Sequence, residues 1–425
     1  MSSDEGYAIA VIGGATAGAE AAGVFSEHGV LTVVFEQNTR PYGKVEDGLP
    51  RWHAALRNKE YAAIDRKLTS PNVHYVPSTT VGEHVGLEEL TGEWGFHAVV
   101  LANGAWRDRP LPVEGADALL GKGFAYQNAF IYWFNHYNEA AYDGEQYEIL
   151  DGTLVVGGGL ASIDVAKVIQ LELCVRALAE RGIEADLVET EVAGIPKTLQ
   201  KLGLTWEELG VEGCTICYRR RPEDMPLVEL PDDANDKVRE RVARGRARIL
   251  EKATEKYLFK VEALRAPSGL IVEDDRLAGL VCDVTKVEDG RARPTGETVE
   301  LRAPMVISSI GSVPAPIAGV RMKGELYGFD DWDLGRMNEH PSLFGVGNVV
   351  TGKGNIVASR KHARSVATRI TADHLELVRK VKKLEPLDDA TRGELLRRVR
   401  EQHERSGYSG DYAAWIDAAT PDDRV

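Results

Sequence analysis

The chain has 425 residues and 43% hydrophobic residues, which is enough for two or three domains with buried cores. Its formal net charge of −15 argues against a nucleic-acid-binding protein, because such proteins are normally basic. Four cysteines are too few for a disulfide scaffold or an iron–sulfur cluster of ordinary spacing, and no apolar run is long enough to cross a bilayer. We therefore expect a cytoplasmic protein with no nucleic-acid or membrane partner.

The first pattern is a β-α-β unit over residues 8–36, with a glycine-rich turn after its first strand. Glycines at such a turn let the backbone approach a pyrophosphate, and the helix start directs free N–H groups at the phosphates. Glu36 ends the second strand, where a carboxylate accepts hydrogen bonds from an adenosine ribose; the alternative is an exposed or helix-capping acid. The predicted dinucleotide contacts are Gly13, Gly14, Ala15, Ala17, Gly18, Glu36 and Gln37.

A further buried strand is predicted at residues 98–102. The strand ends at Asn103 and Gly104, and Ala102, Asn103 and Gly104 are also predicted cofactor contacts. Residues 106–123 contain two prolines and are typical of a connection between domains.

A second glycine turn follows the apolar strand at residues 154–156 and leads into a helix from residue 161 to about 181. The predicted nucleotide contacts there are Gly157, Gly159, Leu160, Ala161 and Ser162. A polar interruption extends through residue 210, and a strand at residues 215–218 precedes Arg219 and Arg220. Paired arginines at this position favour the 2′-phosphate of NADP without forbidding NAD; the alternative is a solvated basic loop.

The remaining elements are antiparallel strands at 279–287 and 298–304, buried strands at 305–311 and 343–348, and a helix over 356–378. A charged amphipathic helix is expected at 388–404 and a polar tail at 406–425. The fold class is α/β, with two Rossmann-like dinucleotide-binding domains and a helical C-terminal extension. We expect an FAD domain at 1–110 and 306–378, an inserted NAD(P) domain at 111–305, and the extension at 379–425. Two nucleotide turns in one chain indicate FAD and NAD(P)(H), with electrons passing between them.

Residues 41–53 run Pro41-Tyr42-Gly43-Lys44-Val45 and then, with fixed spacing, Gly48 and His53. Together with the two turns, this segment resembles the two-dinucleotide flavoprotein family, in its adrenodoxin reductase and glutamate synthase small-subunit branch. The resemblance covers roughly residues 8–375. It implies that Gly43, Lys44 and Val45 contact the flavin and that His53 is a catalytic residue beside the nicotinamide. The alternative for His53 is a surface histidine.

Two later segments carry the same resemblance. Residues 308–317 look like the strand that returns to the flavin domain, and residues 347–356 look like the last flavin-contacting loop. The resemblance implies contacts from Gly311, Gly347, Asn348, Gly354, Asn355 and Ile356; the alternative is a plain glycine turn that caps a helix. Ala15 departs from the family at the second glycine of the first turn, and Asn348 stands where relatives have aspartate or tryptophan.

The resemblance implies an FAD-dependent NAD(P)H oxidoreductase of the ferredoxin-reductase type. The chain has no iron–sulfur ligand set, so its one-electron partner is expected to be another polypeptide, either a loose ferredoxin or a fixed subunit of a redox complex. The flavin subunits of glutamate synthase and of tungsten-dependent aldehyde oxidoreductase are such fixed subunits, and the C-terminal extension favours this arrangement. Basic runs at 237–248 and 380–383 are solvated helix faces or a docking face for an acidic partner.

Two other functions remain as alternatives. Ala15 could leave a degenerate nucleotide-binding scaffold with no turnover of its own. Cys214 and Cys217 have the spacing of a disulfide reductase, but residues i and i+3 of a strand point to opposite faces, which disfavours that chemistry. The histidines are scattered without ligand spacing, so no metal site is predicted.

Overall fold

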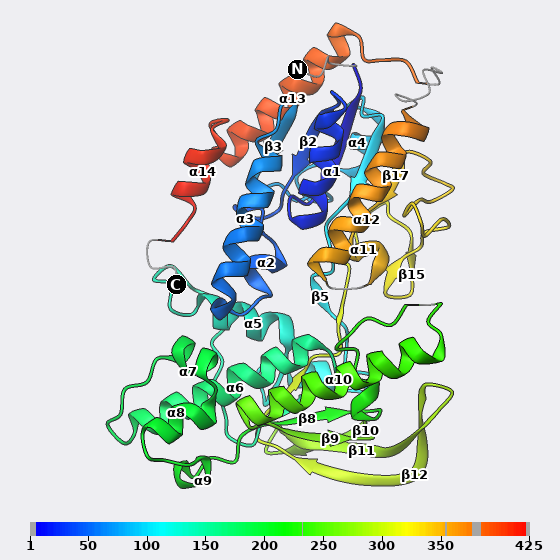
Figure 1. Ribbon diagram of the computed structural model, residues 1–425. Coiled ribbons are helices and arrows are strands. Elements are labelled where there is room, and N and C mark those ends of the chain that lie inside the picture. The colour runs from blue at the N-terminus through cyan, green and yellow to red at the C-terminus, as the bar shows by residue number, and fades with distance from the viewer. Residues whose placement is uncertain (1–5, 232, 353–354, 376–383, 422–425) are drawn as a thin grey trace. The chain divides into compact units, whose positions relative to one another are not determined.

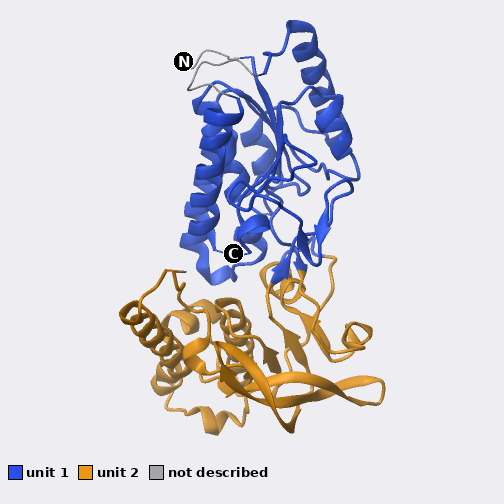
Figure 2. Cartoon of the chain, turned by 90° about the vertical axis from the view of Figure 1, so that its right-hand side faces the viewer, with its two compact units in different colours: residues 1–107, 138–142, 312–425 blue, residues 108–137, 143–311 orange. Residues whose placement is uncertain are grey.

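The computed structural model describes residues 6–231, 233–352, 355–375 and 384–421 (Figure 1). The chain divides into two compact units (Figure 2). Unit 1 comprises residues 1–107, 138–142 and 312–425, and unit 2 comprises residues 108–137 and 143–311. Each unit contains a five-stranded parallel sheet, which confirms the predicted α/β fold class.

The sheet of unit 1 has the order β17-β4-β1-β2-β3. Its strands are β17 (Leu343–Gly345), β4 (Ala98–Leu101), β1 (Ala8–Ile12), β2 (Leu31–Phe35) and β3 (Val73–Val76). Side chains alternate along β1, so that Ile9 and Val11 enter one apolar core while Ala8, Ala10 and Ile12 enter another. Both faces are therefore buried, which is why these strands are continuous apolar runs.

Helices cover both faces of this sheet (Figure 1). One core includes side chains of α1 (Thr16–Glu27), α3 (Ala54–Leu68) and α12 (Ile356–Arg369), and the other includes side chains of α4 (Leu87–Gly92) and α13 (Asp389–Ser406). The short elements of unit 1 include α2 (Lys44–Asp47), η1 (Arg51–His53), β14 (Ser312–Val313), β15 (Met322–Lys323), β16 (Leu326–Tyr327), α11 (Asn348–Thr351) and η4 (Ile370–His374). The helix predicted over 356–378 is thus α12 followed by a π-helical turn, and residues 376–378 lie outside the described residues.

The parallel sheet of unit 2 has the order β6-β13-β7-β8-β9. Its strands are β6 (Phe124–Tyr126), β13 (Val306–Ser308), β7 (Leu154–Val156), β8 (Thr215–Tyr218) and β9 (Lys260–Ala263). Its longer helices are α5 (Gln127–His136), α6 (Leu160–Ala179) and α10 (Asp236–Tyr257). A separate antiparallel sheet consists of β10 (Arg265–Glu273), β11 (Arg276–Glu288) and β12 (Arg291–Arg302), which confirms the predicted antiparallel pairing.

The polar interruption predicted up to residue 210 is wrong in one respect, because it contains three short helices. These are α7 (Leu187–Ala193), α8 (Ile195–Lys201) and α9 (Trp206–Leu209). Capping side chains stabilise two of them: Asp186 accepts the Glu189 N–H at 2.7 Å, and Thr205 forms a reciprocal capping box with Glu208.

The polar tail predicted at 406–425 is also wrong, because helix α14 (Tyr412–Ala418) follows α13. Asp411 caps it by accepting the Ala414 N–H at 3.1 Å. The rings of Tyr408 and Tyr412 lie 5.9 and 5.2 Å from the ring of Tyr75 at the end of β3. Aromatic packing therefore orders a segment whose composition is otherwise polar.

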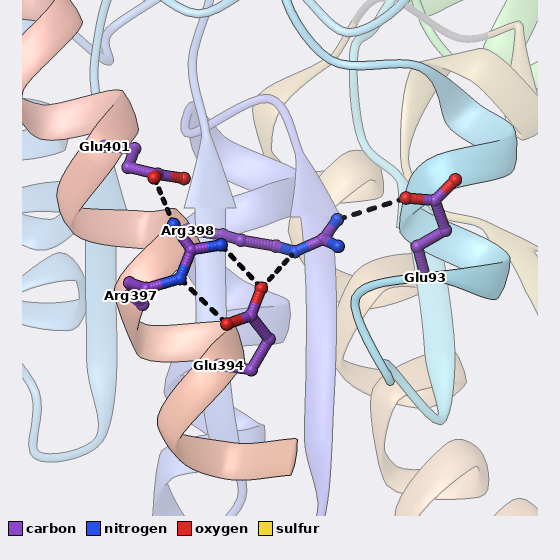
Figure 3. Close-up of polar contacts among 5 residues, drawn as sticks. All are labelled: Glu93, Glu394, Arg397, Arg398 and Glu401. Atoms are coloured by element: carbon purple, nitrogen blue, oxygen red, sulfur yellow. Dashed lines mark hydrogen bonds and ion pairs between the residues drawn. The ribbon is translucent and has the colours of Figure 1, made fainter. Parts of the chain in front are cut away.

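Helix α13 also carries a charged surface network (Figure 3). Arg397 pairs with Glu394 and Glu401 on the same helix, whereas Arg398 bridges Glu394 at 3.1 Å and Glu93 at 3.4 Å. The bond to Glu93, which directly follows α4, connects the C-terminal extension to the remainder of unit 1.

No helix among the described ranges is both long and apolar enough to span a membrane.

Candidate functional site

The glycine turn of unit 1 is compact because its backbone segments touch. The Gly13 N–H donates to the Phe35 carbonyl at 2.7 Å, and Gly13 has a φ of +100°. A Cβ atom on Gly13 would lie 2.7 Å from the Ala102 oxygen, and one on Gly18 would lie 1.8 Å from the Gly13 oxygen. Both positions require glycine, and the turn is held against the carboxyl end of β4.

Glu36 is the charged group at this turn, and it is only 4% exposed. Its Oε2 accepts the Gly14 N–H at 2.7 Å, and its Oε1 accepts the Asn38 N–H at 2.9 Å. Burial raises the pKa of this carboxyl to about 7 in spite of these two bonds. The acid is therefore part of the turn and not a surface acid, whereas the neighbouring Gln37 is exposed.

Two further predicted segments meet the same turn. A Cβ on Gly43 would lie 2.9 Å from the Ala15 methyl, and a Cβ on Gly347 would lie 2.6 Å from the Ala17 methyl. Gly43 has a φ of +51° and carries no Cβ, so the methyl of Ala15 fits beside it without a clash. The segments around Gly13, Gly43, Ala102 and Gly347 converge in unit 1, although they are far apart in sequence.

Buried acceptor atoms remain open near these segments. The Asn103 amide donates to the Tyr327 hydroxyl at 2.9 Å, but its Oδ1 has no hydrogen-bond partner among the described residues. The same holds for Oδ1 of Asn348, the first residue of α11. A glycine cradle with an acid and open acceptors fits a dinucleotide, which brings hydroxyl and N–H donors.

The loop at Gly347 is held by a residue that the sequence did not indicate. The Gly347 N–H donates to Nδ1 of His362 at 3.0 Å, and burial lowers the pKa of that imidazole. The acceptor nitrogen must be unprotonated, so the loop geometry requires a neutral His362. No sequence motif marks this bond, because it joins a loop to the following helix through the tertiary structure.

The other predicted flavin contacts lie in varied environments. Lys44 donates to the Ser312 hydroxyl at 3.0 Å, Val45 is buried, and Gly104 has a φ of +65°. Asn355 caps α12 by accepting the Ala358 N–H at 2.9 Å, Ile356 is half-buried at the helix start, and Gly354 lies outside the described residues. His53 is half-exposed on η1, with its ring 6.1 Å from that of Trp52.

The glycine turn of unit 2 is packed on one side and open on the other. A Cβ on Gly157 would lie 2.2 Å from the Ser309 oxygen, whereas one on Gly159 would meet no atom within 4 Å. Leu160 is 55% exposed and Ala161 is half-buried, while the Ser162 hydroxyl donates to the Ser309 carbonyl at 3.2 Å. The open side therefore begins at Gly159. Gly311 is exposed, with a φ of +104°.

The two predicted arginines line a cavity of about 410 Å³ in unit 2. Arg220 donates to the Tyr218 hydroxyl at 3.0 Å and to the Gly290 carbonyl at 3.2 Å. Arg221, not its two predecessors, pairs with Asp224 at 2.8 Å and with Glu223 at 3.4 Å. Within the described part of the chain, Arg219 and Arg220 thus line the cavity without a carboxylate in salt-bridge range.

The cysteines do not form the motif that their spacing suggests. Cys214 donates to the Ala166 carbonyl at 3.6 Å, whereas the Cys217 sulfur lies 3.9 Å from the sulfur of Cys282 on β11. All four cysteines are buried as free thiols, and burial raises the pKa of Cys214. The described ranges hold no group of three or more histidine, cysteine, aspartate or glutamate side chains that could bind a metal.

Comparison with known proteins agrees with this architecture. Residues 7–201 match the family described as "Pyridine nucleotide-disulphide oxidoreductase". The chain is 24% identical over 385 residues to the glutamate synthase [NADPH] small chain of Mycobacterium tuberculosis, covering 86% of this chain and 66% of that protein. It is 26% identical over 385 residues to human mitochondrial NADPH:adrenodoxin oxidoreductase, covering 83% and 75%.

Among solved structures, Mycobacterium tuberculosis FprA in complex with NADPH superposes with a TM-score of 0.70 at 20% identity, covering 94% of this chain and 90% of that one. This match shows that the fold is shared. The chain spans 34% and 66% of the length of two curated relatives that it matches. These relatives confirm the resemblance to the adrenodoxin reductase and glutamate synthase small-subunit branch.

Proposed function

We propose that this chain is an FAD-dependent oxidoreductase that moves electrons between NAD(P)(H) and an iron–sulfur protein. The proposal rests on the charged side chains beside the two glycine turns, which are acidic at the first turn and basic at the second. The buried carboxylate of Glu36 bonds to the first turn, while Arg219 and Arg220 follow the strand beside the second. A carboxylate recognises ribose hydroxyls, and paired guanidiniums recognise a phosphate. The turns are thus suited to two different nucleotides.

FAD is proposed for unit 1. The ionised carboxylate of Glu36 would hold the adenosine ribose, and the backbone N–H groups at the start of α1 would hold the pyrophosphate. The neutral imidazole of His362 would keep the Gly347 loop in place beside them. The proposed contacts within unit 1 are Gly13, Gly14, Ala15, Ala17, Gly18, Glu36, Gln37, Gly43, Lys44, Val45, Ala102, Asn103, Gly104, Gly347, Asn348, Gly354, Asn355 and Ile356.

The nicotinamide nucleotide is proposed for unit 2, with NADP favoured. Its pyrophosphate would lie at the open side of the turn, where Gly159 has space around it. Contacts there come from Gly157, Gly159, Leu160, Ala161 and Ser162, and Arg219 with Arg220 would bind the 2′-phosphate. Unit 1 is proposed as the FAD domain and unit 2 as the NAD(P) domain, with residues 379–425 as the extension. The expected boundaries of 1–110, 111–305 and 306–378 differ slightly from these units, because β13 pairs within the sheet of unit 2 and that unit extends to residue 311.

Bound FAD would supply, at its N5 atom, the exchange between a nicotinamide hydride and the single electrons that iron–sulfur clusters carry. The residues of this chain would bind and orient the two nucleotides and exclude water from them. His53 is proposed to order the nicotinamide pocket. The partner is proposed to be a ferredoxin-like protein or a subunit of a larger cytoplasmic redox complex. The names of the adrenodoxin oxidoreductase and glutamate synthase relatives support this kind of partner.

The first test is whether the purified chain holds FAD and uses it. We expect flavin absorption, reduction of the flavin by NADPH, and electron transfer to a one-electron dye. Reduction of a ferredoxin should then follow without any small organic substrate. A colourless protein that cannot be reconstituted with FAD would support the degenerate scaffold instead.

The second test concerns the choice of nicotinamide nucleotide. Arg219→Ala with Arg220→Ala should raise the KM for NADPH about ten- to a hundredfold more than the KM for NADH, the effect of a charge-assisted bidentate contact. Arg221→Ala is the matched control, because Arg221 adjoins the pair but bonds to Asp224. A wild-type preference for NADH that the double substitution leaves unchanged would contradict the phosphate role.

A further inference from the structure

Two arginines outside the predicted motif line the same cavity as Arg219 and Arg220. We propose that Arg291 and Arg293, on the hairpin of β11 and β12, form the second wall of a phosphate-monoester pocket that selects the 2′-phosphate of NADP(H). The inference rests on the proposed function of unit 2 and assigns its nucleotide specificity to a second, separate element. The cavity is lined by Arg219, Arg220, Gly290, Arg291, Ala292 and Arg293.

The hairpin geometry puts both arginines on one face. Asp289 and Gly290 have φ values of +50° and +71°, as the two central residues of a tight hairpin turn require. Arg291 and Arg293 follow on β12 two residues apart, and side chains two apart on a strand share a face. Strand β12, which follows the turn, therefore carries the two arginine side chains on the same face.

Hydrogen bonds from side chains to backbone carbonyls hold this hairpin against the loop that follows β8. The Arg220 guanidinium donates to the Gly290 carbonyl at the hairpin turn, at 3.2 Å. The Thr285 hydroxyl on β11 donates to the Arg219 carbonyl at 2.8 Å. The register of β11 against β12 shifts between Asp283 and Thr285, which changes the direction of the hairpin end. The two walls of the cavity are thus joined by hydrogen bonds at two places.

The electrostatics of the cavity call for an anion. Four arginines line the cavity of about 410 Å³, and in the part of the chain that the structure describes none of the four forms a salt bridge to a carboxylate. Glu288 faces Arg291 across the hairpin, but its carboxylate is paired with Lys286 at 2.8 Å. Like charges gathered in one place repel, and a phosphate dianion accepts bidentate bonds from several guanidiniums at once.

The ligand chemistry is a phosphate monoester dianion, which has two sources: a nucleotide 2′-phosphate or free phosphate. The location favours the nucleotide, because the cavity directly follows β8, which pairs with β7 just before the Gly157 turn. NAD carries a hydroxyl where NADP carries the phosphate, so the four guanidiniums would contribute to binding of NADP(H) only.

The test is calorimetric titration of the FAD-loaded protein with adenosine 2′-monophosphate, with adenosine 5′-monophosphate and inorganic phosphate as comparison ligands. Arg291→Ala with Arg293→Ala should weaken the 2′-monophosphate about ten- to a hundredfold, as expected when charge-assisted bonds are lost. The KM for NADPH should rise in parallel while that for NADH stays unchanged. Arg276→Ala with Arg302→Ala is the matched control, because it removes two exposed arginines of the same sheet that do not line the cavity.

The outcomes separate this inference from the proposed function. If the Arg219 and Arg220 substitutions weaken the 2′-monophosphate and the hairpin substitutions do not, the hairpin wall is overturned while the proposed function stands. If inorganic phosphate binds as tightly as the 2′-monophosphate, the pocket takes free phosphate and the nucleotide assignment is overturned. Arg291→Lys with Arg293→Lys keeps the charge without the planar fork, and should restore part of the affinity of the alanine variant. Equal melting temperatures would show that each variant folds.

Discussion

The two glycine turns share a backbone plan but differ in what stands beside them. In unit 1 the side chain of Glu36 is buried and bonded to the backbone of its own turn, and four sequence segments converge there. In unit 2 the space beyond Gly159 is open, and the arginines line a cavity with exposed walls. A buried polar group selects by hydrogen-bond geometry in a dry site, whereas an exposed cationic pocket selects by charge in contact with water.

The contrast suits a ligand that stays in unit 1 and a ligand that exchanges in unit 2. A closed site with many short contacts slows dissociation, because affinity differences appear mainly in the dissociation rate. An open pocket lets a charged ligand enter and leave with little rearrangement. The contrast predicts that substitutions at the first turn disturb both folding and the cofactor, while a substitution on the open side of the second turn, at Gly159, disturbs mainly nucleotide binding.

The largest effect is expected for Gly18→Ala on α1. Its methyl would lie 1.8 Å from the Gly13 oxygen, so the turn must move, and overpacking of this kind costs about 3 kcal/mol or more. We expect a lower melting temperature and protein purified without FAD. Gly23→Ala on the same helix is the control, because its methyl would meet only the flexible side chain of Lys67, at 3.2 Å. Normal FAD content in the Gly18 variant would contradict the close packing of the turn.

The next largest effect is expected in the pH dependence of the folding stability of the FAD-free protein. The folded pKa of Glu36 is about 7, above its unfolded value near 4.5, so the folded state holds a proton that the unfolded chain has released between these values. Stability from this group is fully present below pH 4.5 and is lost as the pH rises through 7, by up to about 1.4 kcal/mol per pH unit.

Urea unfolding from pH 5 to 8 measures this slope. Glu36→Gln should remove it, and the difference between the two proteins cancels the contribution of groups such as His362, whose lowered pKa acts in the opposite direction. Added FAD should flatten the slope of the wild-type protein, since ribose hydroxyls favour the ionised carboxylate. Identical slopes in both proteins would contradict a buried protonated Glu36.

A smaller effect is expected for Gly159→Ala in unit 2. Gly159 has a φ of −90°, which alanine adopts freely, and its methyl would meet no protein atom within 4 Å. Folding stability should therefore change by less than about 1 kcal/mol, the loss of a glycine N-cap. Affinity for the nicotinamide nucleotide should still fall about tenfold if the pyrophosphate occupies this space. A stability loss as large as that of the Gly18 variant would remove the contrast between the two turns.

How far the sequence predicted these sites depends on how local each signal is. Gly13 and Gly157 stand directly after apolar strands, so a short window of sequence indicates their turns. Arg291 and Arg293 reach the cavity only through the hairpin register, and His362 meets Gly347 only when α12 packs beside the sheet. Helix α14 is not evident from composition, because the segment is mostly polar and its order comes from tertiary ring contacts of Tyr408, Tyr412 and Trp415. The contacts of Ser162 were also hidden, since its hydroxyl bonds within the fold.

The smallest effect is expected for a substitution in the C-terminal extension. It tests whether this extension stabilises the loop beside the first turn. The Tyr412 hydroxyl on α14 donates to Asp65 at 2.7 Å, and the same carboxylate oxygen accepts from Tyr42 at 3.0 Å. Tyr42 directly precedes Gly43, on which a Cβ would lie 2.9 Å from the Ala15 methyl of the turn. The Trp415 indole donates to the Thr39 carbonyl at 2.8 Å. The extension is thus bonded to the loop that leads from Glu36 to Gly43.

Tyr412→Phe should loosen this loop by about 1 kcal/mol, because Asp65 keeps its bond from Tyr42. The expected readout is an FAD dissociation rate about fivefold faster, with melting of the FAD-free protein shifted by only a few degrees. Tyr408→Phe is the matched control, since Tyr408 packs on Tyr75 in the same extension and its hydroxyl forms no hydrogen bond to any described residue. Equal FAD dissociation from both variants would separate the extension from the first turn and leave the closure of unit 1 to the sheet, α2 and α11 alone.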